Sequence, residues 1–415
     1  MQNNTVWLDI SELKNWSGSF TGIQRVVYNV GKDLYQGKDI NVKLCRFDYR
    51  RKSFVETEYE FIEHVNEKPT VAPNVVPKSS PSAVIKKLLP RRVKVALKSV
   101  ISYTSPPYVS LKEKIDFKDG DTLFIAGAFW TGQLEGVRKL QEDRRLKVIA
   151  FMYDMVPAIM PQLCTQVTDI DFNREIKKAI RLVDSWVCIS ENTKKDLINY
   201  AKEHKIEMKS KQNVVVRLGS DINVKGDSRS PFTKKNQPKE FLLFVSTLEA
   251  RKNHQLVYQA VKLAEEKGVK LPTIVFAGKH GWHADDLVAA LNRDESIKDK
   301  LVWLRQVDDS NLRWLYQNCL FTLYPSLYEG WGLPVDESIA YNKFCIASSS
   351  SSIPEIAGDM IDYVSPYDAN AMLEKIVHYV EDRAVLKKRS DALKALHQTT
   401  WNDAALVIKE QLIKL

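Results

Sequence analysis

The sequence predicts an α/β protein of two doubly wound domains, each an open parallel sheet covered by helices on both faces. The chain has 415 residues, more than one ordinary hydrophobic core holds. Short continuous apolar runs, typical of strands buried on both faces, alternate with stretches of helical period. The alternation runs on either side of a polar, aperiodic segment at 226–240 that contains Pro231 and Pro238, the best linker candidate.

The first half begins with the apolar run 6–10, a loop at 17–22 rich in glycine, serine and threonine, and a helical pattern over 23–34. This strand–loop–helix order is the building unit of a doubly wound sheet. Further strands are expected at 122–126, 147–152, 184–189 and 213–218, with helices at 176–182 and 192–204.

The second half repeats the alternation and ends in helices. Strands are expected at 241–245, 273–277, 301–304, 321–324, 344–347 and 362–364, and the last helix at 401–415. We therefore expect a domain at 1–230 with an insertion at about 65–112, a domain at 240–398, and a C-terminal helix at 399–415 that returns to the N-terminal domain. Two such halves facing one another leave a cleft between the carboxyl ends of their sheets, where ligands of open sheets bind.

Bulk composition leaves several partners open. Apolar residues make up 44% and charged residues 27%, which is ordinary for a soluble globular protein, and the net charge of +9 suits nucleic acid, acidic lipid or a phosphorylated substrate. The five cysteines are dispersed without a CxxC pair, as expected in a reducing compartment. No signal-peptide pattern and no long uncharged apolar run is found, so a cytoplasmic protein is expected.

Two glutamates, Glu329 and Glu337, stand on a loop and on the helix expected to follow it. Glu329 lies beyond a strand end, and Gly330 and Gly332 let the backbone approach a ligand because they carry no Cβ. The free N–H groups of the helix start favour an anion, and paired carboxylates suit the hydroxyls of sugars and riboses. A glycine-rich turn that caps a helix with two surface acids is the alternative.

Two cations, Arg251 and Lys252, follow the strand at 241–245 and precede a helix at 255–267. That position suits phosphate charge, although a solvated basic turn has the same pattern. Asp154 directly follows a first-half strand and would face the cleft, unless it is a turn or cap residue. Gly22, at the first strand–helix junction, allows close approach to a ligand. No GxGxxG or GxxxxGK[ST] motif and no zinc-binding set is present.

These segments together resemble glycosyltransferase family 4, a group of retaining enzymes with the GT-B fold. The resemblance covers nearly the whole chain except 50–115 and is densest in the second half. Its motifs are 21–25, 153–154, 218–221, 245–254, 277–282, 325–334 and 352–358. Glu329 begins the sequence Glu-Gly-Trp-Gly-Leu-Pro within 325–334, and Glu337 follows it with seven residues between the two, as in the family's pair of glutamates.

The resemblance implies roles for these residues. Glu329 would bind the hydroxyls of the donor sugar and Glu337 the ribose of the nucleotide. Arg251 and Lys252 would hold the diphosphate and stabilise the leaving group, with no metal or cofactor required. The remaining expected contacts to the donor sugar, the nucleotide or the acceptor come from Asp154, Gly332, Leu333, Gly22, Gly278 and Thr247.

Two departures from the family pattern stand out. Tyr153 occupies a position where many members have histidine, and Ser246-Thr247 stands where many have Gly-Arg. The second change implies that the diphosphate relies on Arg251 and Lys252. The subgroup with this Thr-Leu-Glu-x-Arg-Lys-Asn sequence resembles bacterial mannosyltransferases of O-antigen and capsule assembly, which favours GDP-mannose over a UDP-sugar.

The expected function is transfer of a hexose, with mannose favoured, from a nucleotide-diphosphate sugar to a glycan or lipid-linked glycan in surface polysaccharide synthesis. One alternative is a protein of the same fold that binds a nucleotide sugar or carbohydrate without turnover. Another is a different GT-B enzyme, such as a nucleotide-sugar epimerase.

The insertion contains a segment at 83–101 that mixes cationic and aliphatic residues. Such a segment can lie on an anionic membrane, where each Lys or Arg contributes about 1 kcal/mol. The hypothesis is peripheral contact with the inner face of the cytoplasmic membrane, near a lipid-linked acceptor; a locally packed insertion with a solvated basic face is equally open. No nucleic-acid binding is expected, because basic residues alone do not supply platforms for base stacking.

Overall fold

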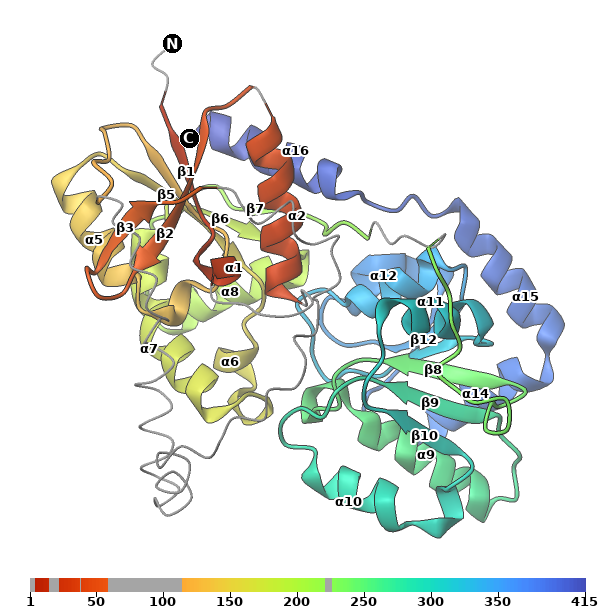
Figure 1. Cartoon of the computed structure of the whole chain (residues 1–415). Coiled ribbons are helices and arrows are strands. Elements are labelled where there is room, and N and C mark those ends of the chain that lie inside the picture. The colour runs from red at the N-terminus through yellow and green to blue at the C-terminus, as the bar shows by residue number, and fades with distance from the viewer. Residues whose placement is uncertain (1–3, 15–21, 38, 59–113, 221–225) are drawn as a thin grey trace, which may run out of the picture. The chain divides into compact units, whose positions relative to one another are not determined.

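The computed structural model describes residues 4–14, 22–37, 39–58, 114–220 and 226–415 (Figure 1). The insertion expected at about 65–112, with its basic segment 83–101, lies outside these residues. Two compact units divide the chain, Met1–Ala150 with Leu415 and Phe151–Lys414. This division falls inside a strand, so the domain limits predicted at 230 and 240 stay a prediction.

The first sheet has seven strands in the order β3-β2-β1-β4-β5-β6-β7. They are β1 (Val6–Asp9), β2 (Val42–Asp48), β3 (Ser53–Glu56), β4 (Thr122–Ile125), β5 (Lys147–Met152), β6 (Ser185–Cys188) and β7 (Val214–Val215). The ladders β1–β2, β1–β4, β4–β5 and β6–β7 are parallel, and β2–β3 is antiparallel. The strands β2 and β3 were not predicted, because Lys43 and Arg46 interrupt the apolar positions of β2 and because β3 has only two apolar residues.

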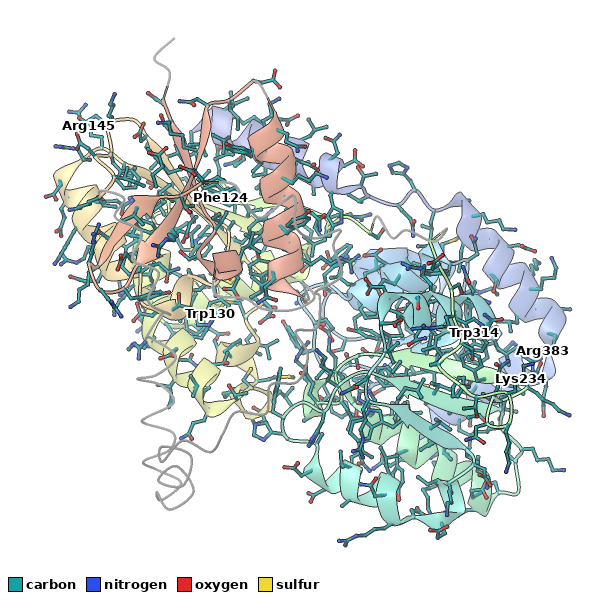
Figure 2. All side chains as sticks on the ribbon, viewed as in Figure 1. Phe124, Trp130, Arg145, Lys234, Trp314 and Arg383 are labelled. Carbon is teal, nitrogen blue, oxygen red and sulfur yellow. The ribbon has the colours of Figure 1, made fainter. Side chains whose placement is uncertain are left out.

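The helices that accompany this sheet follow the expected alternation. They are α1 (Ser11–Lys14), α2 (Ile23–Gln36), η1 (Phe129–Thr131), α5 (Leu134–Asp143), α6 (Val156–Ile159), η2 (Pro161–Leu163), α7 (Gln166–Leu182) and α8 (Glu191–Glu203). The predicted apolar face of α2 is buried at Val26, Val27 and Val30. In the first unit, Phe124 of β4 is fully buried, whereas Arg145 lies at the periphery (Figure 2).

The second sheet has six parallel strands in the order β10-β9-β8-β11-β12-β13. They are β8 (Phe241–Val245), β9 (Thr273–Ala277), β10 (Leu301–Leu304), β11 (Thr322–Tyr324), β12 (Cys345–Ser348) and β13 (Asp362–Val364). The helices are η3 (Ala250–Lys252), α9 (His254–Glu266), α10 (Asp285–Arg293), η4 (Glu295–Ile297), α11 (Asp309–Asn318), α12 (Leu333–Ala340), α13 (Ile353–Ala357), η5 (Gly358–Met360), α14 (Ala369–Glu381), α15 (Arg383–Ala392), η6 (Leu393–Ala395) and α16 (Trp401–Lys414).

Helices cover the second sheet on both faces. Phe241 of β8 stacks on Trp314 of α11, with ring centroids 5.9 Å apart. Phe244 points to the opposite face, because successive side chains of a strand alternate, and stacks on His254 of α9 at 4.0 Å. The predicted fold class, two doubly wound α/β sheets, is confirmed.

The C-terminal helix α16 contacts the first sheet at β6. The side-chain amide of Gln411 donates to the Ser185 hydroxyl at 2.9 Å, and both groups are buried. At its start, a Cβ on Gly219 would lie 2.4 Å from the backbone nitrogen of Trp401, so the helix begins against this glycine. Among the helices that the structure describes, none has the length and apolar character needed to cross a bilayer.

Candidate functional site

Arg251 and Lys252 lie in the short turn that joins β8 to α9. After the strand, Glu249 is extended, and Ala250–Lys252 form the one-turn helix η3. Asn253 then takes a left-handed conformation, with φ of 61°, and α9 begins at His254. The turn places both cationic side chains at the carboxyl end of a central strand, only 17% and 13% exposed.

Asn253 fixes this turn to two other loops. Its side-chain amide donates to the carbonyl oxygens of Pro325 and Pro366 at 3.0 and 2.7 Å, and the residue is buried. Asparagine is also among the few residues that adopt the left-handed conformation readily. The sequence therefore uses one side chain to join the ends of β8, β11 and β13.

An Asn253→Asp substitution is expected to destabilise the protein by about 2–4 kcal/mol. The carboxylate has nearly the same shape, but it loses both donated hydrogen bonds and faces two carbonyl oxygens in a buried place. The measurement is the free energy of unfolding in urea. Asn292→Asp, the same exchange at an exposed position in α10, is the control; equal stability of the two variants would contradict this role of Asn253.

Glu329 is held on the loop between β11 and α12. Its backbone N–H donates to the Ser351 hydroxyl at 2.8 Å, and its carbonyl accepts from the Ser352 hydroxyl at 2.9 Å. The loop ends at Gly332, whose φ of 134° favours glycine, and α12 starts at Leu333 with Pro334 in its first turn. These contacts fix the Glu329 backbone, and its side chain is 7% exposed.

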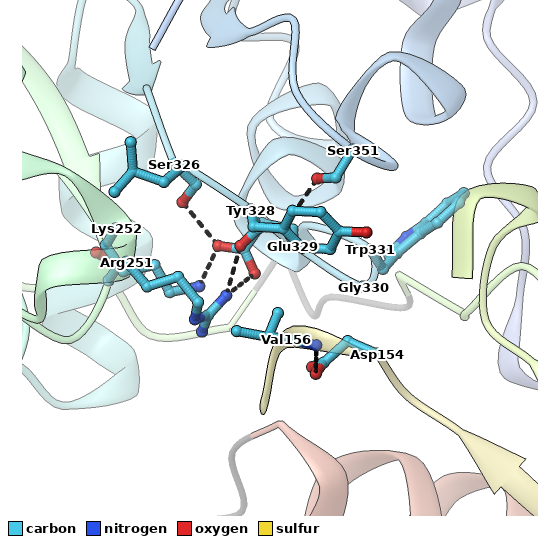
Figure 3. Close-up of polar contacts among 12 residues, drawn as sticks. Asp154, Val156, Arg251, Lys252, Ser326, Tyr328, Glu329, Gly330, Trp331 and Ser351 are labelled. Carbon is cyan, nitrogen blue, oxygen red and sulfur yellow. Dashed lines mark hydrogen bonds and ion pairs between the residues drawn. The ribbon is translucent and has the colours of Figure 1, made fainter. Parts of the chain in front are cut away.

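The Glu329 carboxylate contacts both cations (Figure 3). One oxygen accepts from Lys252 Nζ at 2.6 Å, from the Ser326 hydroxyl at 2.7 Å and from the Tyr324 hydroxyl at 3.0 Å. The other oxygen accepts from Arg251 Nη1, which also donates to the Tyr328 carbonyl at 3.0 Å. We call Arg251, Lys252 and Glu329 the charged cluster.

The electrostatics of the charged cluster keep Glu329 ionised. Burial alone would raise the pKa of this carboxyl, but the adjacent charges of Arg251 and Lys252 overcome it and lower the pKa to about 2. Burial and the nearby Arg251 charge lower the pKa of Lys252, whereas its hydrogen bond to Glu329 opposes that shift. The cluster thus concentrates two cationic groups in a place with little water.

Asp154 lies close to this loop, directly after β5. A Cβ on Gly330 would lie 1.9 Å from the carbonyl oxygen of Tyr153, so the two backbones are in direct contact. Asp154 accepts a hydrogen bond from the Val156 backbone N–H at 3.0 Å, as a turn residue does. Burial raises the pKa of its carboxyl, and the charge of Arg251 opposes the shift. The structure therefore brings Asp154 next to the charged cluster.

The other predicted site residues occupy three places. Glu337 lies within α12 and accepts from the Tyr316 hydroxyl at 2.9 Å, one turn beyond Gly332 and Leu333. Gly278 follows β9 with φ of 158°, and its close approach to Ser246 places it beside Thr247. Gly22 precedes α2 with φ of 53° and belongs to the first compact unit.

Several polar residues around the cluster had no role in the sequence analysis. Glu249 accepts from Arg251 Nη2 at 2.8 Å, and Tyr324 and Ser326 bind Glu329. The signal for Glu249 and Ser326 was their presence in the motifs 245–254 and 325–334, and Tyr324 ends the strand just before the second of them. Asp196 on α8, which pairs with the Tyr328 hydroxyl, had no local signal, because that contact spans 132 positions.

The two cations of the charged cluster suit a phosphate group. No group of three or more His, Cys, Asp or Glu side chains with metal-binding geometry occurs in the part of the chain that the structure describes. Guanidinium and ammonium groups at a strand end and helix start bind phosphate through charge-assisted hydrogen bonds. A carboxylate beside them can accept from hydroxyl groups.

One family model matches a segment in the second half of the chain. Residues 227–396 match the family described as Glycosyl transferases group 1. The matched segment contains the whole charged cluster and both glutamates of the predicted pair.

The chain is similar to parts of two bacterial proteins that are named as mannosyltransferases. O-antigen chain mannosyltransferase B of Escherichia coli is 31% identical over 143 residues, which is 34% of this chain and 37% of the relative. Serotype-specific mannosyltransferase WbdA of Escherichia coli is 25% identical over 270 residues, 61% of this chain and 32% of the relative. The chain thus spans about a third of the length of these relatives.

Solved structures match over the full chain. Anabaena HepE, solved with UDP and glucose, has a TM-score of 0.61 at 14% identity and covers 99% of this chain and 100% of its own. Sucrose-phosphate synthase from Thermosynechococcus elongatus has a TM-score of 0.61 at 16% identity, covering 99% and 98%. At such identities the likeness concerns the fold, and it confirms the predicted GT-B type.

Proposed function

We propose that this chain, whose residues 227–396 match the family Glycosyl transferases group 1, is a retaining hexosyltransferase that uses a nucleoside-diphosphate sugar. The observation that carries the proposal is the buried charged cluster at the carboxyl ends of β8 and β11. Ligands of open parallel sheets bind at that end of the strands.

The cluster supplies what departure of a diphosphate requires. Breaking the bond between the anomeric carbon and the phosphate oxygen leaves negative charge on the leaving group. Arg251 and Lys252 stabilise that charge, and the N–H groups at the start of α12 add a positive dipole end. The new bond forms to an acceptor hydroxyl, whose proton passes to the departing phosphate. No metal is needed for these steps.

Glu329 and Glu337 divide donor recognition between them in this proposal. Glu329 exchanges contacts with the cations for contacts with sugar hydroxyls, and Glu337 on α12 accepts from the ribose. Asp154 contacts the donor sugar or the acceptor. Retention of the anomeric configuration is proposed from the family resemblance. The place of Asp154 in the site is supported by its proximity to the charged cluster.

The proposed donor is GDP-mannose and the proposed acceptor a glycan or lipid-linked glycan. The matched relatives of Escherichia coli are named as O-antigen or serotype-specific mannosyltransferases, which supports mannose and surface polysaccharide synthesis. HepE was solved with UDP and glucose, so a UDP-sugar is the competing donor to test. The proposed place of the reaction is the inner face of the cytoplasmic membrane, which the segment 83–101 would contact.

A thermal-shift screen of GDP-, UDP- and dTDP-sugars tests the donor assignment. A ligand that binds only the folded state at a hundred times its Kd stabilises by about 2.7 kcal/mol. We expect GDP-mannose to raise the Tm more than the other nucleotide sugars do. When a mannosylated glycolipid is added as the acceptor, we expect GDP and a glycolipid with one more mannose as products. Binding without transfer would favour a carbohydrate-binding protein, and an altered sugar nucleotide without acceptor would favour an epimerase.

A further inference from the structure

Glu249 is a buried carboxylate that the proposed reaction does not use. Its side chain is 2% exposed, and its oxygen accepts from Arg251 Nη2 at 2.8 Å. The Arg251 guanidinium therefore lies between two carboxylates, Glu249 on one side and Glu329 on the other, with the Tyr328 carbonyl as a third acceptor.

The position of Glu249 is set by the backbone on both sides of it. The Leu248 N–H donates to the Lys279 carbonyl at 2.8 Å, and the Ala250 N–H donates to the Trp282 carbonyl at 3.2 Å. A Cβ on Gly281 would lie 3.0 Å from the Glu249 Cβ, so the loop after β9 presses against this residue. The carboxylate is thus built into the turn rather than swinging in solvent.

The charge of Glu249 changes what the cluster offers to an anion. When all four are ionised, the carboxylates of Glu249 and Glu329 balance the charges of Arg251 and Lys252. A diphosphate then adds negative charge beside four groups that sum to zero and beside the Asp154 carboxyl. Without the charge of Glu249 the cluster would carry one net positive charge, and the same ligand would be attracted more strongly.

We propose that Glu249 is a positioning residue with two effects on Arg251: it fixes the guanidinium, and its negative charge limits how tightly the nucleoside diphosphate is held. The second effect speeds release of the product. This inference rests on the proposed function, because it takes the diphosphate to bind at Arg251.

Two neutral variants separate the effects. Glu249→Gln keeps an oxygen that accepts from Arg251 and loses the charge, whereas Glu249→Leu loses both. Isothermal titration with GDP and UDP gives the Kd, and steady-state transfer gives kcat and KM. Glu240→Gln is the matched control, because Glu240 accepts from Arg383 Nη2 at 2.9 Å but is exposed (Figure 2 labels Arg383).

We expect both variants at Glu249 to bind the nucleoside diphosphate at least about five-fold tighter than wild type, by the loss of one buried charge. The glutamine variant lowers kcat and KM together and keeps kcat/KM. The leucine variant also loses kcat/KM, because Arg251 has lost one of its acceptors. The control variant behaves as wild type in all three quantities.

If the wild-type chain binds the nucleoside diphosphate and both folded variants bind it no tighter, this inference is wrong and the proposed function still stands. Equal kcat/KM in the two variants would overturn the positioning effect. If the wild-type chain binds neither GDP nor UDP, the proposed function fails, and the inference fails with it.

Discussion

Replacing Glu329 with glutamine is expected to reduce sugar transfer by about two to three orders of magnitude, the loss typical of removing one preorganised polar contact in an active site. The substitution removes the charge that four side-chain donors share, namely those of Arg251, Lys252, Tyr324 and Ser326. Arg251 and Lys252 then repel one another, and Glu249 is the carboxylate still paired with Arg251. The acceptor for the sugar hydroxyls is weakened as well.

The measurement is kcat/KM for transfer, with circular dichroism to show that the variant folds. Removing one partner of a buried ion pair is itself destabilising by about 3–5 kcal/mol, so unfolding must be checked first. Glu381→Gln, at an exposed position on α14, is the control. A folded Glu329→Gln variant that transfers at the wild-type rate would show that the charged cluster does not carry the reaction.

A Gly330→Ala substitution is expected to destabilise the protein by more than about 3 kcal/mol and to abolish transfer. The added Cβ would lie 1.9 Å from the Tyr153 carbonyl oxygen and 3.1 Å from the Asp154 Cβ, and the first distance is far inside any van der Waals contact. The clash is with backbone, which cannot rotate away, so the two segments must separate. Separation removes Asp154 from the cluster.

Urea unfolding and transfer rates together measure this effect. Gly268→Ala is the control, because Gly268 follows α9 with φ of 67° and an added Cβ there meets nothing within 4 Å. That control has a conformational cost of about 1–2 kcal/mol without a clash. Equal destabilisation by the two variants would mean that the contact between Gly330 and Tyr153 is not tight.

Much of the fold follows from patterns that are local in the sequence. Continuous apolar runs predicted every strand of the second sheet, because parallel strands buried on both faces carry apolar residues at successive positions. The strand β2 was missed because its sequence, Val-Lys-Leu-Cys-Arg-Phe-Asp, mixes charged residues with buried ones. That pattern is also typical of loops and amphipathic helices.

The candidate site was predictable residue by residue but not as a network. Position after a strand and before a helix singled out Arg251, Lys252 and Glu329, yet their mutual ion pairs span 77 and 78 positions. From the family resemblance, the two cations were expected to bind a diphosphate and the carboxylate to bind sugar hydroxyls. Gly330 and Gly332 were expected to let the backbone approach a ligand, which stays a prediction, and the contact of Gly330 with the Tyr153 backbone was not foreseen. Such contacts depend on the tertiary fold, which spacing does not encode.

The central claim is that the charged cluster serves transfer of a sugar from a nucleoside-diphosphate donor. Its most direct test is incubation of the wild-type chain with GDP-mannose and a mannosylated glycolipid, followed by quantification of GDP and determination of the new linkage by NMR. We expect one GDP for each mannose transferred, with the anomeric configuration of the donor retained in the product. Mannose transfer with inverted configuration, or no transfer from GDP-, UDP- or dTDP-sugars to any glycolipid tested, would contradict it.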